Sequence, residues 1–133
     1  VDAREYLASL AGKAVDGTGV EASIEADDIP VSLDSAVPLG LLFHELMTNA
    51  VRHGYAEGRG PVGGRSGRID VRFARDGEAA VLEVRDYGRG FEDGTADGLG
   101  LTIARALAAQ LNGGITVASE SSGTRAAARI TIS

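Results

Sequence analysis

The sequence predicts an α+β domain, a two-layer sandwich in which helices cover one face of a mixed, mostly antiparallel sheet. Three observations lead to this prediction. Segments with helical spacing and segments with strand alternation follow in the order helix, strand, long helix, two strands, helix, two strands. The dipeptide Asp76–Gly77 separates two alternating runs, which is typical of an antiparallel hairpin. The length of 133 residues suits a single domain with one core.

The composition is globular, and the charge disfavours two classes of partner. Hydrophobic residues make up 44% of the chain and charged residues 24%, and no apolar run approaches the roughly 20 residues of a membrane span. The net charge of -6 disfavours nucleic acid and anionic lipid, so we expect no nucleic-acid partner and no direct membrane contact. No cysteine is present for disulfides or thiolate zinc sites, and cytoplasm is the default location. The chain starts at Val1 on an amphipathic segment without a signal-peptide pattern, so we expect a piece of a longer protein.

The first third of the chain predicts one helix and one strand. Asp2 is a candidate N-cap for a helix over residues 1–15. Its apolar face repeats at helical spacing through Tyr6, Leu7, Leu10 and Ala14. Residues 20–26 alternate apolar and polar side chains as a half-buried strand does, and the following Asp-Asp-Ile-Pro breaks the run.

A long helix is expected from Asp34 to about His53, with Gly54 available to end it. Its predicted apolar positions are Val37, Leu41, Leu42, Leu46 and Ala50. Residues 57–67 contain too much glycine for regular structure and predict a mobile surface loop.

The second half of the chain predicts four strands and one helix. Residues 68–75 and 79–86 alternate as strands, with Ile69, Val71 and Phe73 inward in the first, and Val81 or Leu82 together with Val84 in the second. A second flexible segment is expected over residues 87–100. A helix then follows, with Leu99, Ile103, Leu107 and Leu111 at steps of four, and it ends at Asn-Gly-Gly. Residues 115–119 and 124–133 alternate as two strands around a turn at Ser121–Gly123.

The long helix carries polar groups that suit a metal and a phosphate. Glu45, Asn49 and Arg52 or His53 follow at steps of three and four, so their side chains share one stripe. A carboxylate, an amide oxygen and a cation in line can hold a hydrated divalent ion and a phosphate. A solvated helix face with paired charges is the alternative, and the helix alone leaves both open.

Two further motifs suit a nucleotide. Asp86 ends a strand and opens "DYGRGF", where Gly88 and Gly90 permit a close backbone approach, so its carboxylate can accept from an exocyclic amine such as that of adenine. A turn-forming aspartate is the alternative. The "GLGL" run, Gly98–Leu101, opens a helix whose first-turn amides suit phosphate oxygens. The spacing matches neither a Walker loop nor a Rossmann fingerprint.

The runs "HELMTNAVRHG", "DYGRGF" and "GLGLTIARALAAQLNG" resemble, in this order, the N, G1 and G2 boxes of the Bergerat-fold ATPases, which include sensor histidine kinases, gyrase and MutL. The resemblance covers residues 34–133, and residues 1–33 add a helix and a strand to the same single domain. "PLGLLFHELMTNAVRHGY" and "LAAQLNGGI" look most like histidine kinases of the HisKA_2 or HWE type. The chain lacks tryptophan and a phenylalanine-rich F box, so HisKA_2-like is the better description.

This resemblance implies roles for individual residues. Asn49 would coordinate Mg²⁺, and Glu45 would orient or activate a water or the acceptor near the γ-phosphate. Asp86 would bind the adenine amine, with Thr124 nearby. Gly88 and Gly90 would shape the base pocket, and Arg52 and His53 would contact phosphates. The phosphate cradle would be formed by Gly98, Leu99, Gly100 and Leu101. For these roles to hold, Asp86 and Asn49 must face a common hollow.

The implied function is that of the ATP-binding catalytic domain of a sensor histidine kinase. Such a domain transfers the γ-phosphate of Mg-ATP to a histidine in a separate dimerisation domain, and a response regulator is then an indirect partner. The "HEL" of His44 also resembles a phospho-acceptor box, but its place before Asn49 favours a packing or supporting role. The alternatives are an anti-sigma-factor serine kinase of the same fold and a degenerate scaffold that does not bind ATP.

Overall fold

The described part of the chain folds as one five-stranded sheet with three helices. The computed structural model describes residues 1–55, 67–87, 99–120 and 123–131, and within these ranges the side chains of residues 53–55, 99–100 and 119–120 are not described. The elements are α1 (Ala3–Val15), β1 (Glu21–Ala26), α2 (Leu33–Tyr55), β2 (Arg68–Asp76), β3 (Ala79–Asp86), α3 (Leu99–Gln110), β4 (Gly114–Glu120) and β5 (Gly123–Thr131). Each predicted helix and strand is present, whereas the expected loops at 57–66 and 88–98 lie outside the described residues.

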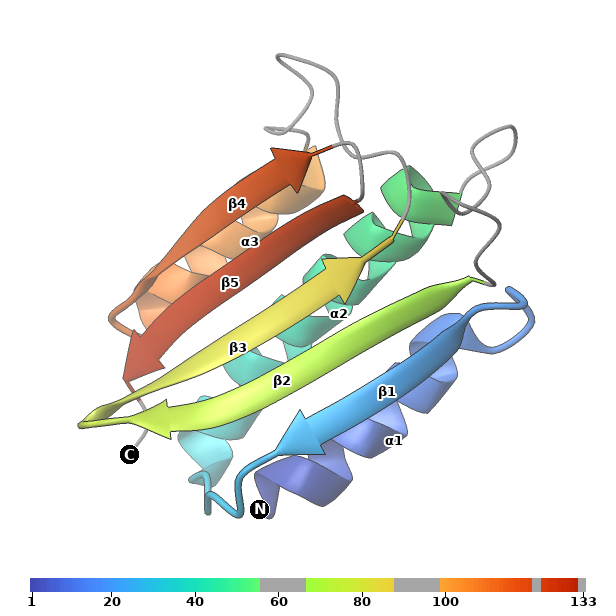
Figure 1. Ribbon diagram of the computed structural model, residues 1–133. Helices are drawn as coiled ribbons and strands as arrows, with labels where there is room; N and C mark the ends of the chain where they lie inside the picture. The colour runs from blue at the N-terminus through green and yellow to red at the C-terminus, as the bar shows by residue number, and fades with distance from the viewer. Residues whose placement is uncertain (56–66, 88–98, 121–122, 132–133) are drawn as a thin grey trace.

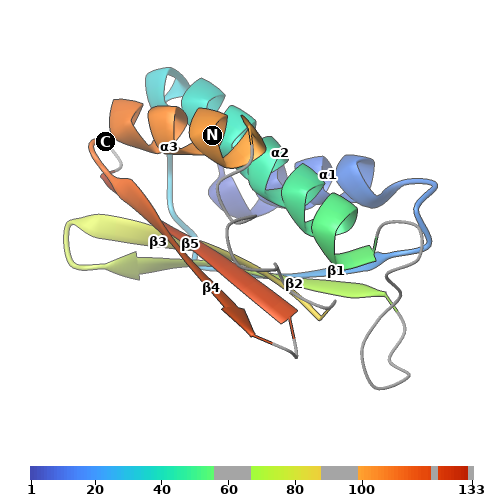
Figure 2. The same ribbon diagram turned by 90° about the horizontal axis from the view of Figure 1, so that it is seen from above.

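The sheet is mixed, as the sequence predicts. Its strand order is β1-β2-β3-β5-β4, with β1 parallel to β2 and all other neighbours antiparallel (Figure 1). The β2–β3 hairpin pairs Asp76 with Ala79, and Gly77 has a φ of 62° that its missing side chain permits. All three helices lie on one face of the sheet (Figure 2). The predicted two-layer α+β class is therefore confirmed.

The N-terminal helix and strand belong to the same core as the rest of the chain. Asp2 caps α1, since its Oδ1 accepts from the backbone N–H of Arg4 at 2.9 Å. β1 extends the sheet through its parallel ladder with β2. The buried hydrophobic cluster continues from Leu7 on α1 to Ile130 on β5. The first 33 residues thus complete one layer of helices and one edge of the sheet.

The face that α2 buries differs partly from the predicted one. Leu42, Leu46 and Ala50 are buried as expected, but Val37 is 62% exposed and Leu41 52% exposed. The residues that fill the remaining core positions on α2 are Ala36, Leu39, Phe43 and Met47. The helix carries apolar side chains on more than one stripe, so spacing alone could not choose the stripe that meets the sheet. The helix also continues through Gly54 to Tyr55.

α1 and α2 approach closely at a glycine. The Tyr6 hydroxyl donates to the carbonyl oxygen of Ala36 at 2.9 Å. A Cβ on Gly40 would lie 2.1 Å from that hydroxyl oxygen, so only glycine leaves room for the contact. The contact fixes the start of α2 against α1, at residues that do not line the hollow described below.

α3 shows the same kind of difference as α2. Leu107 and Leu111 are buried as predicted, whereas Ile103 is 42% exposed and Leu101 takes the core position at the start of the helix. The helix ends at the predicted Asn-Gly-Gly, where Asn112 adopts a φ of 56°. The N–H groups of residues 112 and 113 donate to the carbonyls of residues 109 and 108 at 3.0 and 2.9 Å, which closes a Schellman motif.

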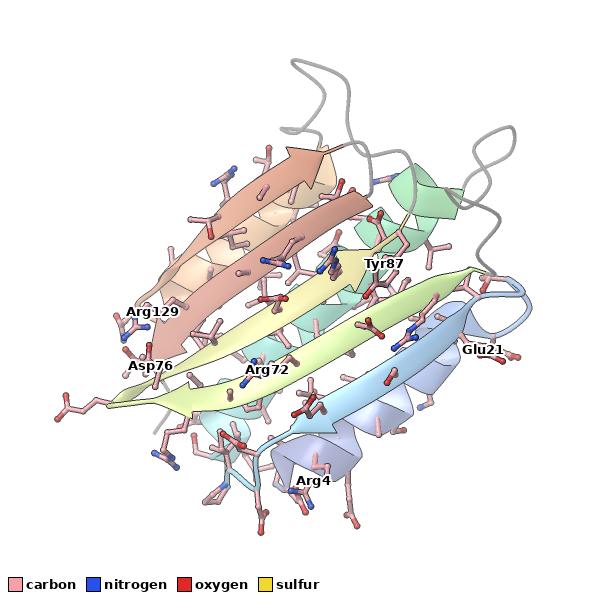
Figure 3. The ribbon with its side chains drawn as sticks, viewed as in Figure 1. Arg4, Glu21, Arg72, Asp76, Tyr87 and Arg129 are labelled. Atoms are coloured by element: carbon pink, nitrogen blue, oxygen red, sulfur yellow. The ribbon has the colours of Figure 1, made fainter. Side chains whose placement is uncertain are left out.

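The face of the sheet away from the helices is polar. Opposite charges pair on this face: Arg125 on β5 lies 3.2 Å from Glu83 on the adjacent β3, and Arg129 on β5 pairs with Asp76 at the end of β2. Figure 3 shows Asp76 and Arg129 side by side near one end of the sheet. Among the described residues, no helix has both the length and the apolar content needed to cross a bilayer.

Candidate functional site

A hollow of about 280 Å³, part of it open to solvent, lies between the helices and the sheet. It forms where α2 and β3 end and β5 begins, at the upper end of the molecule in Figure 1. The described residues that line it are Leu46, Asn49, Ala50, Val84, Asp86, Leu101, Val117, Thr124 and Ala126. Asp86 and Asn49 therefore face the same hollow, as the sequence requires for a joint site.

Buried polar side chains concentrate at this hollow. Within the described ranges the buried polar or charged residues are Ser35, Asn49, Asp86 and Thr124, with exposed fractions between 3% and 9%. All except Ser35 line the hollow. Among the described residues every buried polar side-chain atom has a hydrogen-bond partner within the protein. Polar side chains that converge on one concavity with apolar walls are typical of a site for a ligand with polar groups.

The strand pattern explains how a carboxylate reaches the inner face. On β3, Ala80, Leu82 and Val84 are buried in alternation, and Asp86 continues that alternation at the strand end with 3% exposure. Its Oδ1 accepts from the backbone N–H of Thr124 on β5 at 3.3 Å. The carboxylate is therefore held between two antiparallel strands and faces the hollow.

Gly123 contributes to the site without having been foreseen. Its φ is +140°, and a Cβ there would lie 2.1 Å from the backbone oxygen of Asp86 and 3.0 Å from Cα of Tyr87. Only glycine allows β5 to approach the end of β3 this closely. The sequence predicts only a turn at this glycine, although its place directly before Thr124 is a signal for a role in the site. The apolar walls formed by Val117 and Ala126 were also missed.

Asn49 brings a buried side-chain amide to the hollow, and its oxygen lies near a cation. Asn49 is 7% exposed, and its Oδ1 accepts from Nη2 of Arg52 at 3.1 Å. Over the part of the chain that the structure describes, no group of three or more His, Asp or Glu side chains gathers as a metal site. An amide oxygen that faces a hollow fits Mg²⁺, which is usually bound by one or two protein oxygens together with water and substrate phosphates.

Other predicted residues on α2 lie outside the lining. Glu45 is half-buried one turn before Asn49, and Arg52 is exposed, and neither is among the described residues that line the hollow. His44 is exposed, so the expected packing role is wrong, because this position of α2 faces away from the core. The side chain of His53 is outside the described set.

The start of α3 opens on the hollow. Leu101 is the third residue of α3 and is 1% exposed in the hollow wall, so the first turn of the helix lies beside it. Free amides and the positive dipole end of a helix suit phosphate oxygens. The positions Gly88, Gly90 and Gly98 lie outside the described residues, and of Leu99 and Gly100 only the helical backbone is described.

A hydrogen-bonded group stands behind Asp86 on the opposite face of the sheet. The Tyr87 hydroxyl donates to Oδ2 of Asp70, and Nε of Arg68 donates to Oδ1 of Asp70 at 2.8 Å. Burial raises the pKa of Asp70, but the hydrogen bonds from Tyr87 and Arg68 outweigh it and hold this pKa below its ordinary 3.8. The bond to Asp70, followed by burial, raises the pKa of Tyr87 above its ordinary 10.0.

Comparison with known proteins agrees with this geometry. Residues 34–133 match the family described as histidine kinase-, DNA gyrase B- and HSP90-like ATPase. A curated relative, Blue-light-activated histidine kinase 2 of Erythrobacter litoralis, is 29% identical over 127 residues, which cover 90% of this chain and 35% of the relative. The chain thus spans about a third of that relative.

Solved structures show the same fold over nearly the whole chain. The blue-light activated histidine kinase EL346 of Erythrobacter litoralis matches with a TM-score of 0.87 and 25% identity, over 99% of this chain and 42% of that one. The histidine kinase AdeS of Acinetobacter baumannii matches with a TM-score of 0.78 and 18% identity, over 98% of this chain and 65% of that one. With the family match over residues 34–133, the chain belongs to the histidine kinase-, DNA gyrase B- and HSP90-like ATPase family.

Proposed function

We propose that this chain is the ATP-binding catalytic domain of a sensor histidine kinase of the HisKA_2-like branch. Such a domain transfers the γ-phosphoryl group of Mg-ATP to a histidine in a separate dimerisation and phosphotransfer domain, and a response regulator is the indirect partner. The observation that carries the proposal is the joint burial of Asp86 and Asn49 around one hollow. The histidine kinase names of the relatives support the same conclusion.

Adenine recognition is the role proposed for Asp86. Its carboxylate accepts a hydrogen bond from the exocyclic amine, while the N–H of Thr124 fixes the other side of the acid at 3.3 Å. The apolar walls of the hollow, including Val84 and Ala126, suit the faces of the base. Gly88 and Gly90 are proposed to shape the base pocket.

The phosphates are proposed to extend from the base toward α2 and the start of α3. Asn49 would supply an oxygen to Mg²⁺, which neutralises phosphate charge when bound. Arg52 already stands 3.1 Å from the Asn49 oxygen, where a cation can also contact phosphates. His53 is assigned the same phosphate-contacting role, and the cradle is assigned to Gly98, Leu99, Gly100 and Leu101.

Glu45 is the residue proposed to orient the acceptor. It lies one helical turn before Asn49 and is half-buried, so its carboxylate can reach the end of the site where the γ-phosphate would lie. Positioning and charge neutralisation supply most of the rate in phosphoryl transfer, and a carboxylate that orients the acceptor adds to them. A cytoplasmic location is proposed with this function, because the substrate is ATP.

Calorimetry with Mg-ADP tests the proposal directly. We expect saturable binding, with heat that depends on Mg²⁺. An absence of binding at millimolar nucleotide would leave a scaffold that keeps the fold without the ligand. Transfer of ³²P from ATP to a supplied histidine phosphotransfer domain then distinguishes a histidine kinase from a kinase that phosphorylates serine.

A further inference from the structure

We propose that Tyr87 is a positioning residue for adenine recognition: its hydroxyl, held by Asp70 on β2, fixes the strand end that carries the Asp86 carboxylate. The inference rests on the proposed function and adds to it a residue on the opposite face of the sheet. Tyr87 is not among the described residues that line the hollow, whereas its chain neighbour Asp86 is. The effect of Tyr87 on the nucleotide is therefore inferred to pass through Asp86.

The ladder between β2 and β3 ends just before Tyr87. The last β2–β3 pair is Ile69 with Asp86, so Tyr87 lies one residue beyond the ladder. There the hydrogen bond from its side chain to Oδ2 of Asp70 continues the attachment of β3 to β2. Figure 3 shows Tyr87 near the end of β3, on the sheet face away from the helices.

Neighbouring side chains on both β2 and β3 hold this attachment in place. Asp70 is itself fixed by Nε of Arg68 at 2.8 Å, and the guanidinium carbon of Arg85 lies 4.9 Å from the centroid of the Tyr87 ring. A cation over an aromatic face is attracted to the ring, which restricts the ring further. The lowered pKa of Asp70 and the raised pKa of Tyr87 are what a hydroxyl-to-carboxylate bond produces.

β5 packs against the Asp86–Tyr87 peptide on the side of β3 opposite to β2. The backbone of Gly123 packs so closely on Asp86 and Tyr87 that a Cβ there would lie 2.1 Å from the Asp86 oxygen. Asp86 and Tyr87 share a peptide and point to opposite faces of the sheet. Rotation of that peptide would therefore move the carboxylate in the hollow and the ring behind it together.

The test compares two tyrosines that both lose a hydroxyl. In Tyr87→Phe, we expect the Kd for Mg-ADP to rise about 3- to 10-fold, because the lost hydroxyl-to-carboxylate bond affects the nucleotide only through the position of Asp86. Inosine diphosphate lacks the exocyclic amine, so its Kd for Tyr87→Phe should stay within about twofold of its Kd for the unsubstituted chain. Tyr6→Phe removes a 2.9 Å hydrogen bond between α1 and α2 and should change neither affinity.

A double-mutant comparison separates positioning from general stability. Tyr87→Phe should add less than about twofold to the Kd of an Asp86→Asn variant, because the carboxylate that it positions is then absent. Asp70→Ala removes the acceptor and should reproduce the loss for ADP, which keeps the test valid if Tyr87→Phe folds poorly. Equal losses for ADP and inosine diphosphate, or no loss for either, would overturn the inference. If the unsubstituted chain does not bind Mg-ADP, the proposed function is overturned, and the inference that rests on it is overturned with it.

Discussion

Replacement of Asp86 by asparagine should weaken nucleotide binding without weakening the fold. The carboxylate is 3% exposed and accepts from the N–H of Thr124 at 3.3 Å. A hydrogen bond from the adenine amine to a charged oxygen contributes about 1–3 kcal/mol, so the Kd for Mg-ADP should rise roughly 5- to 150-fold.

Although Asp86→Asn should weaken nucleotide binding, it should leave the thermal stability of the fold unchanged or increase it. Asp86→Asn keeps an oxygen that can accept from Thr124 while it removes a buried charge. The thermal midpoint should therefore be equal to that of the unsubstituted chain or higher. The assays are isothermal titration with Mg-ADP and thermal unfolding without ligand.

Asp76→Asn is the matched control for this experiment. Asp76 is an exposed acid at the other end of β2, where it pairs with Arg129, and its removal should leave the affinity unchanged. An Asp86→Asn variant with the affinity of the unsubstituted chain would refute the adenine contact. A markedly lower thermal midpoint with unchanged affinity would show that the carboxylate serves the fold.

Three further predictions follow from the same structure. Asn49→Ala should remove most of the Mg²⁺ dependence of ADP affinity, and an unchanged metal titration would exclude Asn49 as the ligand. Leu42→Ala should lower the free energy of unfolding by about 2–5 kcal/mol because Leu42 is 0% exposed, whereas Leu41→Ala at 52% exposure should lower it by less than about 1 kcal/mol, as measured by urea unfolding. The lowered pKa of Asp70 contributes stability that is present above about pH 4 and lost as the pH falls through the folded-state pKa of Asp70. The raised pKa of Tyr87 contributes stability that is present below about pH 10 and lost as the pH rises through the folded-state pKa of Tyr87. The difference in thermal midpoint between the unsubstituted chain and Tyr87→Phe should accordingly be largest between pH 4 and 10, and a difference that does not change with pH would contradict the Tyr87–Asp70 bond.

The sequence by itself determined the elements and the class of fold. Strand alternation has a period of two and helical repetition a period of 3.6, so local patterns distinguish the two without any knowledge of their neighbours. The turn at Gly77 and the helix end at Asn112 were likewise readable, because each depends on a residue that accepts an unusual backbone conformation. The sequence also placed Asp86 at the end of a strand, but it left open whether Val81 or Leu82 faces inward on that strand.

Only the tertiary structure decided which side of each element meets the core and what stands behind the site. Val37 and Leu41 satisfy helical spacing as well as Leu42 does, yet the sheet packs against the stripe of Leu42. Gly123 and Tyr87 act through residues that are distant in the chain, on β3 and β2, and no local pattern contains such contacts. Periodicity is a property of a segment, whereas burial and hydrogen bonding across a sheet belong to pairs of segments, and the pairing of strands and helices determines them.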